Sequence, residues 1–225
     1  MTTPLTPDEI LQRMYDETLS GNAPEVLALT HQALEMGMEP QSLLFDSLIP
    51  SLEEVGARFE RGDYFVPEML IAGRAMAGAM EVLRPLLAET GVETIGKFLM
   101  GTVKGDVHDI GKNLVNIMLE GAGFEVIDLG VQVPPERFVE KILEHQPDIV
   151  GMSAFLTTTM PMFKANINAL QKAGVRDKVA VMVGGAPVTQ EYADAVGADG
   201  YAADASATVK KAKALLNERR AKVPA

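Results

Sequence analysis

The sequence contains no cysteine and no uninterrupted run of eighteen apolar residues. The first absence excludes disulfides, thiolate metal ligands and cysteine nucleophiles. The second leaves no candidate membrane-spanning helix. The segment from Met1 to Pro7 also lacks the basic and apolar regions of a secretory signal. We therefore expect a cytoplasmic protein with no membrane partner.

Positive charge is scarce, because 20 Lys and Arg face 31 Asp and Glu and leave a formal net charge of −11. Non-specific nucleic-acid binding needs a basic footprint, so we expect no nucleic-acid partner. The basic residues between 210 and 222 fit the solvated face and last turn of a terminal helix. Hydrophobic residues make up 47% of the 225 positions, which is enough for one large domain or two small ones.

The first part of the chain, residues 1–90, is predicted to be helical. Capping signals stand at Thr6, Pro7 and Glu9 for a first helix and at Asn22 and Glu25 for a second. Apolar residues at helical spacing predict two further helices, the earlier of them kinked at Pro50. Four helices joined by short loops indicate a four-helix bundle.

From residue 91 to 225, short apolar runs alternate with helical stretches. Strands are expected at 97–103, 125–129, 149–154, 179–183 and 200–203, and helices near 110–121, 135–145, 160–173, 188–196 and 205–219. Five such β-α units predict an α/β domain with a doubly wound, five-stranded parallel sheet of the Rossmann or flavodoxin-like kind.

The motif Asp106-x-His108-x-x-Gly111 follows the first expected strand. An imidazole placed there can bind a metal through one nitrogen, while the aspartate accepts a hydrogen bond from the other. Ser153 follows the third strand and the pair Gly184-Gly185 follows the fourth. Ligands of such sheets bind at the carboxyl ends of the strands, so these residues are predicted to face one site.

Each of these features has a simpler interpretation when taken alone. The motif could be a surface loop, the glycine pair a plain turn, and Ser153 a helix N-cap. A zinc or iron hydrolase built on His108 would have few ligands of suitable spacing. No G-x-G-x-x-G follows the first strand and residues 101–105 do not form a P-loop, which disfavours NAD and nucleoside triphosphates.

Taken together, the motifs resemble the cobalamin-binding module of methionine synthase and the free-standing corrinoid proteins of methyltransferase systems. The resemblance extends from about residue 8 to 217 and rests on residues 56–68, 101–113, 129–134, 153–160 and 183–187. It implies cobalamin or a related corrinoid, a cobalt cofactor, as the ligand.

The resemblance also implies roles for single residues. His108 would replace the benzimidazole of the cofactor as lower axial ligand of the cobalt (base-off, His-on), with Asp106 and Thr159 as its relay. The remaining contacts it implies are Gly105, Val107, Asp109, Ile110 and Gly111 in the motif, Ser153, Phe155, Thr157, Gly184, Gly185 and Ala205 along a slot for the nucleotide tail, and Phe59 and Val66 over the upper face.

Two residues depart from the family pattern. Phe155 stands where the family has leucine, which would make the slot wall bulkier, and Val66 is smaller than the usual leucine. Phe59 could also be an ordinary core residue. A buried nucleotide tail needs a wall poor in side chains, and paired glycines would supply one.

The function implied is that of a methyl carrier, a subunit and not a complete enzyme. It would shuttle a methyl group from a donor methyltransferase to an acceptor, a corrinoid:folate or corrinoid:thiol methyltransferase, with a reductive activase as a further partner. The donor could be methanol, a methylamine, a methoxylated aromatic or a betaine. The alternatives are a cobalamin-dependent sensor, which would need a basic DNA-binding segment, and the small subunit of a mutase.

Overall fold

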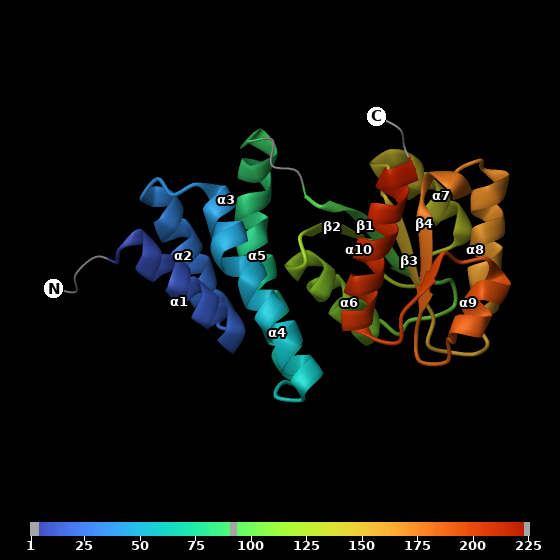
Figure 1. Cartoon of the computed structure of the whole chain (residues 1–225), viewed down its shortest axis with the longest axis horizontal. Coiled ribbons are helices and arrows are strands. Elements are labelled where there is room, and N and C mark those ends of the chain that lie inside the picture. The colour runs from blue at the N-terminus through green and yellow to red at the C-terminus, as the bar shows by residue number, and fades with distance from the viewer. Residues whose placement is uncertain (1–4, 91–93, 223–225) are drawn as a thin grey trace. The chain divides into compact units, whose positions relative to one another are not determined.

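The computed structural model describes residues 5–90 and 94–222 of the chain (Figure 1). The chain divides into two compact units, one of Met1–Glu93 with Glu120–Gly123 and the other of Thr94–Leu119 with Phe124–Ala225. Within the described ranges, no helix is both long enough and apolar enough to span a membrane.

The first unit is helical, as predicted. Its elements are α1 (Pro7–Ser20), α2 (Ala23–Glu35), α3 (Pro40–Leu43), a π-helical turn (Leu44–Leu48), α4 (Ile49–Arg61) and α5 (Val66–Thr90). Buried aliphatic and methionine side chains from these helices form its core, including Ile10, Met14, Leu29, Leu48, Leu52, Met76 and Leu83. The predicted helix bundle is therefore confirmed.

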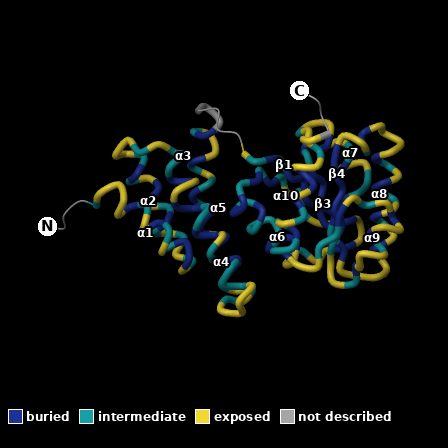
Figure 2. Tube along the Cα trace, viewed as in Figure 1, coloured by how far each residue is buried: buried dark blue, intermediate teal, exposed yellow. Residues whose placement is uncertain are grey.

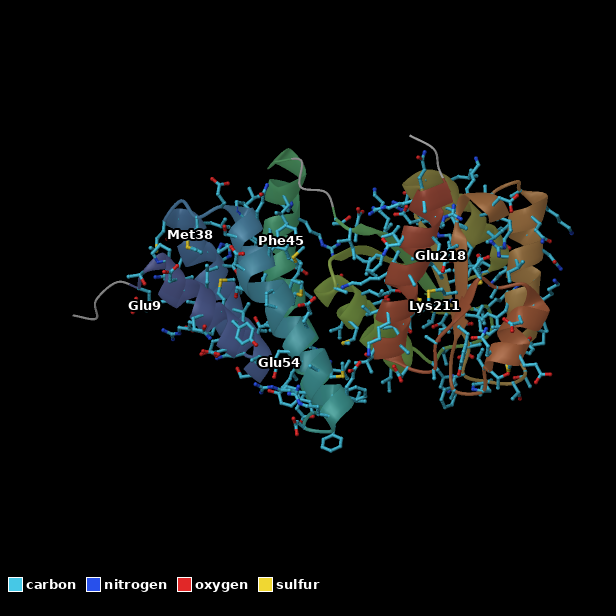
Figure 3. The ribbon with its side chains drawn as sticks, in the orientation of Figure 1. Glu9, Met38, Phe45, Glu54, Lys211 and Glu218 are labelled. Carbon is cyan, nitrogen blue, oxygen red and sulfur yellow. The ribbon has the colours of Figure 1, made fainter. Side chains whose placement is uncertain are left out.

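The capping signals of the first two helices have different outcomes. The Thr6 hydroxyl accepts a hydrogen bond from the N–H of Glu9 (3.3 Å), and the Glu9 carboxylate, labelled in Figure 3, accepts one from the N–H of Thr6 (2.8 Å). The second capping box is wrong, because Asn22 makes no side-chain cap. Its amide nitrogen donates to the carboxylate of Glu17 at 2.7 Å, a bond that holds the side chain toward the preceding helix.

The third helical segment is broken just before Pro50. The π-helical turn Leu44–Leu48 ends where α4 begins, and Pro50 lies in the first turn of α4. Proline has no N–H to donate, so the start of a helix accommodates it better than a helix interior. The predicted kink is thus a boundary between two helical segments.

The second unit is built, as predicted, on a five-stranded, all-parallel sheet. Its strand order is β2-β1-β3-β4-β5. Its elements are β1 (Gly96–Thr102), α6 (Ile110–Gly121), β2 (Phe124–Asp128), α7 (Pro135–His145), β3 (Ile149–Ser153), α8 (Pro161–Lys172), β4 (Ala180–Gly184), α9 (Gln190–Val196), β5 (Gly200–Tyr201) and α10 (Ala205–Lys222), with a short 3₁₀ turn at Arg176–Lys178. The strands form the buried centre of this unit (Figure 2).

Helices cover both faces of this sheet. One core joins Leu99, Val150 and Val181 of the strands to Phe138 of α7 and Phe163 of α8. On the opposite face, side chains of α10 pack against strand glycines. The methyl groups of Leu216 lie next to Gly96, and the stem of Lys211, labelled in Figure 3, lies against Gly200.

Candidate functional site

Asp106 lies at the centre of the site, in the loop that follows β1, and its side chain is fully buried. Its Oδ1 accepts hydrogen bonds from the backbone N–H of His108 (3.0 Å) and from His108 Nδ1 (2.8 Å). Its Oδ2 accepts from the N–H groups of Phe155 (2.8 Å) and Leu156 (3.2 Å) and from the Thr159 hydroxyl (2.7 Å). One carboxylate thus joins the loop after β1 to the loop after β3.

These donors decide the protonation of Asp106. Burial by itself would raise the pKa of this carboxyl, but the hydrogen bonds from Thr159, His108 and Phe155 outweigh it and hold the pKa of Asp106 well below its usual range. An ionised carboxylate can only accept hydrogen bonds, so His108 Nδ1 must carry a proton and donate it. In the neutral imidazole the lone pair is then on Nε2, the nitrogen with which the ring can bind a metal.

The imidazole is positioned from several sides and remains accessible. The Thr102 hydroxyl donates to the carbonyl of His108 (3.2 Å), and the N–H of Gln132 donates to the carbonyl of Asp106 (3.0 Å). The ring of Phe155 stacks on the imidazole with 4.4 Å between ring centroids and 26° between planes. The His108 side chain is still 43% exposed.

Phe155, predicted to lie along the slot, contacts the imidazole in the structure. Ser153 belongs to β3, but Phe155 lies beyond the end of that strand, and its ring is exposed and stacked on His108. The only signal in the sequence was the phenylalanine itself, at a position where leucine was expected. The backbone N–H groups of Phe155 and Leu156 that bind Asp106 gave no sequence signal.

A row of small side chains crosses the carboxyl ends of three strands. Thr102 pairs in register with Ser153, and Ser153 pairs with Gly184. A Cβ added to Gly184 would meet only the carbonyl oxygen of Ala202, at 3.6 Å. Gly185 is different, because its φ is +130° and an added Cβ would lie 1.9 Å from the carbonyl oxygen of Ala154. Gly184 therefore leaves space, while Gly185 allows two backbone segments to approach closely.

Large apolar side chains are exposed in the loops at this edge of the sheet. They follow β1, β2 and β3 and comprise Val107, Ile110, Val131, Phe155 and Leu156, each between 37% and 65% exposed. We call these five residues the apolar rim. Such a concentration of exposed apolar area indicates a binding surface. The sequence had indicated Val107, Ile110 and Phe155 but not Val131 or Leu156.

The other predicted residues are placed as follows. Gly105 has a φ of +84°, the Asp109 carbonyl accepts the N–H of Asn113 at 2.7 Å, and Gly111 lies in the first turn of α6. Thr157 is exposed, and Ala205 is buried at the start of α10. Phe59 and Val66 lie in the helical unit, near the end of α4 and at the start of α5, and both are half-buried.

An imidazole with its Nδ1 held by a buried carboxylate, at the carboxyl edge of a 2-1-3-4-5 sheet, defines an α/β protein of the kind that binds a metal-containing cofactor. Family models described as B12 binding domain match residues 96–210 and residues 10–84. The chain belongs to this B12-binding family of corrinoid proteins, and its cofactor is cobalamin or a related corrinoid.

Named relatives and solved structures match over most of the chain. A dimethylamine corrinoid protein from Methanosarcina barkeri is 44% identical over 94% of this chain and 100% of its own length. Trimethylamine corrinoid protein 1 from Methanosarcina acetivorans is 41% identical over 93% of this chain and 98% of its own. The methanol:cobalamin methyltransferase complex from Methanosarcina barkeri matches with a TM-score of 0.80 at 28% identity, covering 96% of this chain and 86% of that one.

A cobalamin-binding protein from Desulfitobacterium hafniense matches with a TM-score of 0.67 at 31% identity, covering 91% of this chain and 98% of that one.

The residues present at the site fit a corrinoid. Nε2 of His108 is free of the Asp106 hydrogen bond, the apolar rim lies at the same edge of the sheet, and Gly184 leaves space in the row beside Ser153. These are the features that a metal, a large macrocycle and a nucleotide tail would each require.

Proposed function

We propose that this protein is a methyl carrier that binds its corrinoid with His108 as the lower ligand and serves methyltransferases as partners. The observation that carries the proposal is the fully buried Asp106 carboxylate, which holds His108 Nδ1 at 2.8 Å and so turns Nε2 into the metal-binding nitrogen. When bound, the corrinoid supplies the chemistry, because its cobalt accepts a methyl group from a donor and passes it to an acceptor.

The residues of the protein would hold the corrinoid and orient the histidine that binds its metal. The Asp106 carboxylate fixes the tautomer of His108, and its negative charge makes the imidazole a better metal ligand. The Thr159 hydroxyl holds that carboxylate in place. The apolar rim would contact the macrocycle and keep water from it. Ser153 and Gly184 would receive the nucleotide tail at the ends of β3 and β4, because Gly184 leaves space there.

The relatives support the choice of partners. Two of them are named dimethylamine corrinoid protein and trimethylamine corrinoid protein, and one structural neighbour is a methanol:cobalamin methyltransferase complex. A methylamine methyltransferase is accordingly the donor partner we propose, with a corrinoid:thiol or corrinoid:folate methyltransferase as acceptor.

The axial ligand can be tested with protein grown on ¹⁵N-labelled histidine and loaded with cobalamin. In the cobalt(II) EPR spectrum, one ¹⁴N ligand splits each line into three, and one ¹⁵N ligand splits it into two. We expect the doublet in the wild type and in the control His31→Ala, whose histidine is exposed in α2. His108→Ala should lose it. A triplet in labelled wild type, or no bound cobalamin, would overturn the proposal.

The carrier role has its own test. Reduced, cobalamin-loaded protein is mixed with dimethylamine or trimethylamine and a purified methylamine methyltransferase, and methyl uptake is followed by the visible spectrum. Asp106→Asn should lower the rate by about 10- to 100-fold, the usual loss when the partner of a metal-binding histidine is removed. No uptake from any amine, combined with DNA binding at moderate salt, would favour a sensor instead.

A further inference from the structure

Phe155 covers one face of the imidazole that the site presents. The two rings are nearly parallel, with 4.4 Å between centroids and 26° between planes. The phenyl ring is 51% exposed, although an aromatic side chain of this size is usually more deeply buried. Its backbone is not free to move away, because the N–H of Phe155 donates to Asp106 Oδ2 at 2.8 Å. The stacked ring and the hydrogen-bonded histidine are therefore tied to one carboxylate.

The hydrogen bond to Asp106 restrains the imidazole incompletely. Small changes in χ1 and χ2 can tilt the ring while Nδ1 stays within hydrogen-bond distance of Asp106 Oδ1, and such a tilt displaces Nε2. A flat ring stacked on the imidazole face opposes this tilt, since tilting either plane reduces their contact. The two restraints together determine both the direction and the plane of the imidazole.

We infer that Phe155 is a positioning residue that fixes the ring plane of His108 and so aims Nε2 at the bound metal. The inference rests on the proposed function and deepens it, because it assigns a second determinant of the axial bond besides Asp106. A leucine at this position would fill similar volume without a flat surface. Phe155→Leu therefore removes the planar contact and preserves the packing, and Phe155→Tyr preserves both, since the exposed ring leaves room for a hydroxyl.

The first measurement uses the protein without cofactor. Stacking on a phenyl ring shifts the imidazole protons of His108 upfield in the NMR spectrum. We expect Phe155→Leu to move them downfield toward the positions of a solvated histidine, and Phe155→Tyr to leave them near their wild-type positions. Leu143→Ala serves as the control, since Leu143 is an exposed apolar residue of α7 outside the apolar rim. Unchanged His108 shifts in Phe155→Leu would overturn the inference.

The second measurement uses ¹⁵N-histidine protein loaded with cobalamin and compares the fraction of cobalt(II) that shows the histidine doublet. Loss of an aromatic pair of this geometry corresponds to about a two- to tenfold change in an equilibrium constant. Phe155→Leu should lower the ratio of histidine-bound to unbound cobalt by about that factor. Phe155→Tyr and Leu143→Ala should retain the wild-type ratio.

The outcomes separate the two proposals. A doublet in wild type that is equally strong in Phe155→Leu would overturn the role of Phe155 and leave His108 as the ligand. Absence of the doublet from wild type would overturn both. A doublet that is reduced in Phe155→Leu and retained in Phe155→Tyr, together with the shifted His108 resonances, would support the positioning role, because leucine keeps the packing and lacks only the flat ring.

Discussion

The hydroxyl of Thr159 donates a 2.7 Å hydrogen bond to Asp106 Oδ2, joining two loops that are 53 residues apart in the chain. Thr159 is only 7% exposed, so water cannot readily replace its hydroxyl. Thr159→Ala should therefore leave one oxygen of a buried carboxylate short of a donor and destabilise the protein by about 1–3 kcal/mol. Thr159→Ser keeps the hydroxyl and should lose less stability. Urea unfolding measures the free energy of unfolding of both variants.

Thr158→Ala is the matched control for this change. Thr158 is the neighbouring residue in the same loop and is exposed, so its loss should alter the free energy of unfolding by less than about 0.5 kcal/mol. Equal effects of the two alanine substitutions would mean that the hydrogen bond to Asp106 contributes nothing measurable.

The same carboxylate should make stability depend on pH. Burial raises the pKa of Asp106, but its hydrogen bonds lower the pKa by more than burial raises it. The pKa of Asp106 in the native protein therefore lies below the unfolded value of about 3.9. The unfolded chain then binds the proton first on acidification, and the contribution of Asp106 is present above about pH 4 and falls as the pH drops below it. The stability difference between wild type and Asp106→Asn should follow that profile.

Unfolding experiments between about pH 3 and pH 7 would reveal this. The control is Asp46→Asn, because Asp46 is exposed in the helical unit. It reports the effect of the same substitution where the side chain is exposed. A stability difference between wild type and Asp106→Asn that does not change with pH would contradict the lowered pKa of Asp106.

Much of this fold could be predicted because its signals are local. Alternating apolar runs and helical stretches determine the five β-α units, and parallel topology then places the Asp106 loop, Ser153 and Gly184 at one edge. Asn22 shows where local signals fail. Asn22 does occupy the N-cap position of α2, but its side chain is held by the carboxylate of Glu17 and makes no cap, and only the folded turn brings Asn22 and Glu17 together.

The details of the site depended on backbone geometry that residue types do not encode. Two N–H groups, of Phe155 and Leu156, point at Asp106 only because of how the loop after β3 turns. The stacking of Phe155 on His108 requires the same turn. Likewise the sequence treats Gly184 and Gly185 alike, while the structure gives one of them open space and the other a positive φ.

This difference between the two glycines predicts opposite effects of one substitution. Gly185→Ala would force a side chain into a φ of +130° and place a Cβ 1.9 Å from the Ala154 carbonyl oxygen, so it should cost more than about 3 kcal/mol or prevent folding. Gly184→Ala should change the stability of the cofactor-free protein by less than about 1 kcal/mol, since its Cβ makes only an ordinary contact with Ala202.

Gly184→Ala should nonetheless weaken cobalamin binding, because the methyl group occupies space proposed for the nucleotide tail. Thermal unfolding and a cobalamin titration of the same samples separate the two effects. Gly184→Ala with wild-type affinity would argue against a tail in this row. A stable, fully folded Gly185→Ala would argue against the close approach of the two backbones.

Lys112 is a buried lysine that forms an ion pair with Asp128. Lys112, in the first turn of α6, is 2% exposed, and its ammonium donates to Asn113 Oδ1 and to Asp128 Oδ2 at the end of β2. Removing Asp128 leaves this ammonium buried with one neutral partner, whereas Lys112→Met replaces the whole side chain by an apolar one of similar length. Removing only the carboxylate and leaving the ammonium buried costs more stability than replacing the buried lysine by an apolar side chain.

Asp128→Asn should therefore destabilise the protein by about 1–3 kcal/mol, a range below that of a fully buried pair because Asp128 is partly exposed. Lys112→Met should cost less, and the double variant should be no less stable than Asp128→Asn alone, since no unpaired charge remains in it. Urea unfolding of the three variants measures the coupling. If Lys112→Met is the most damaging of them, the ion pair itself stabilises the junction of α6 with β2, and the penalty of an unpaired ammonium is the smaller effect.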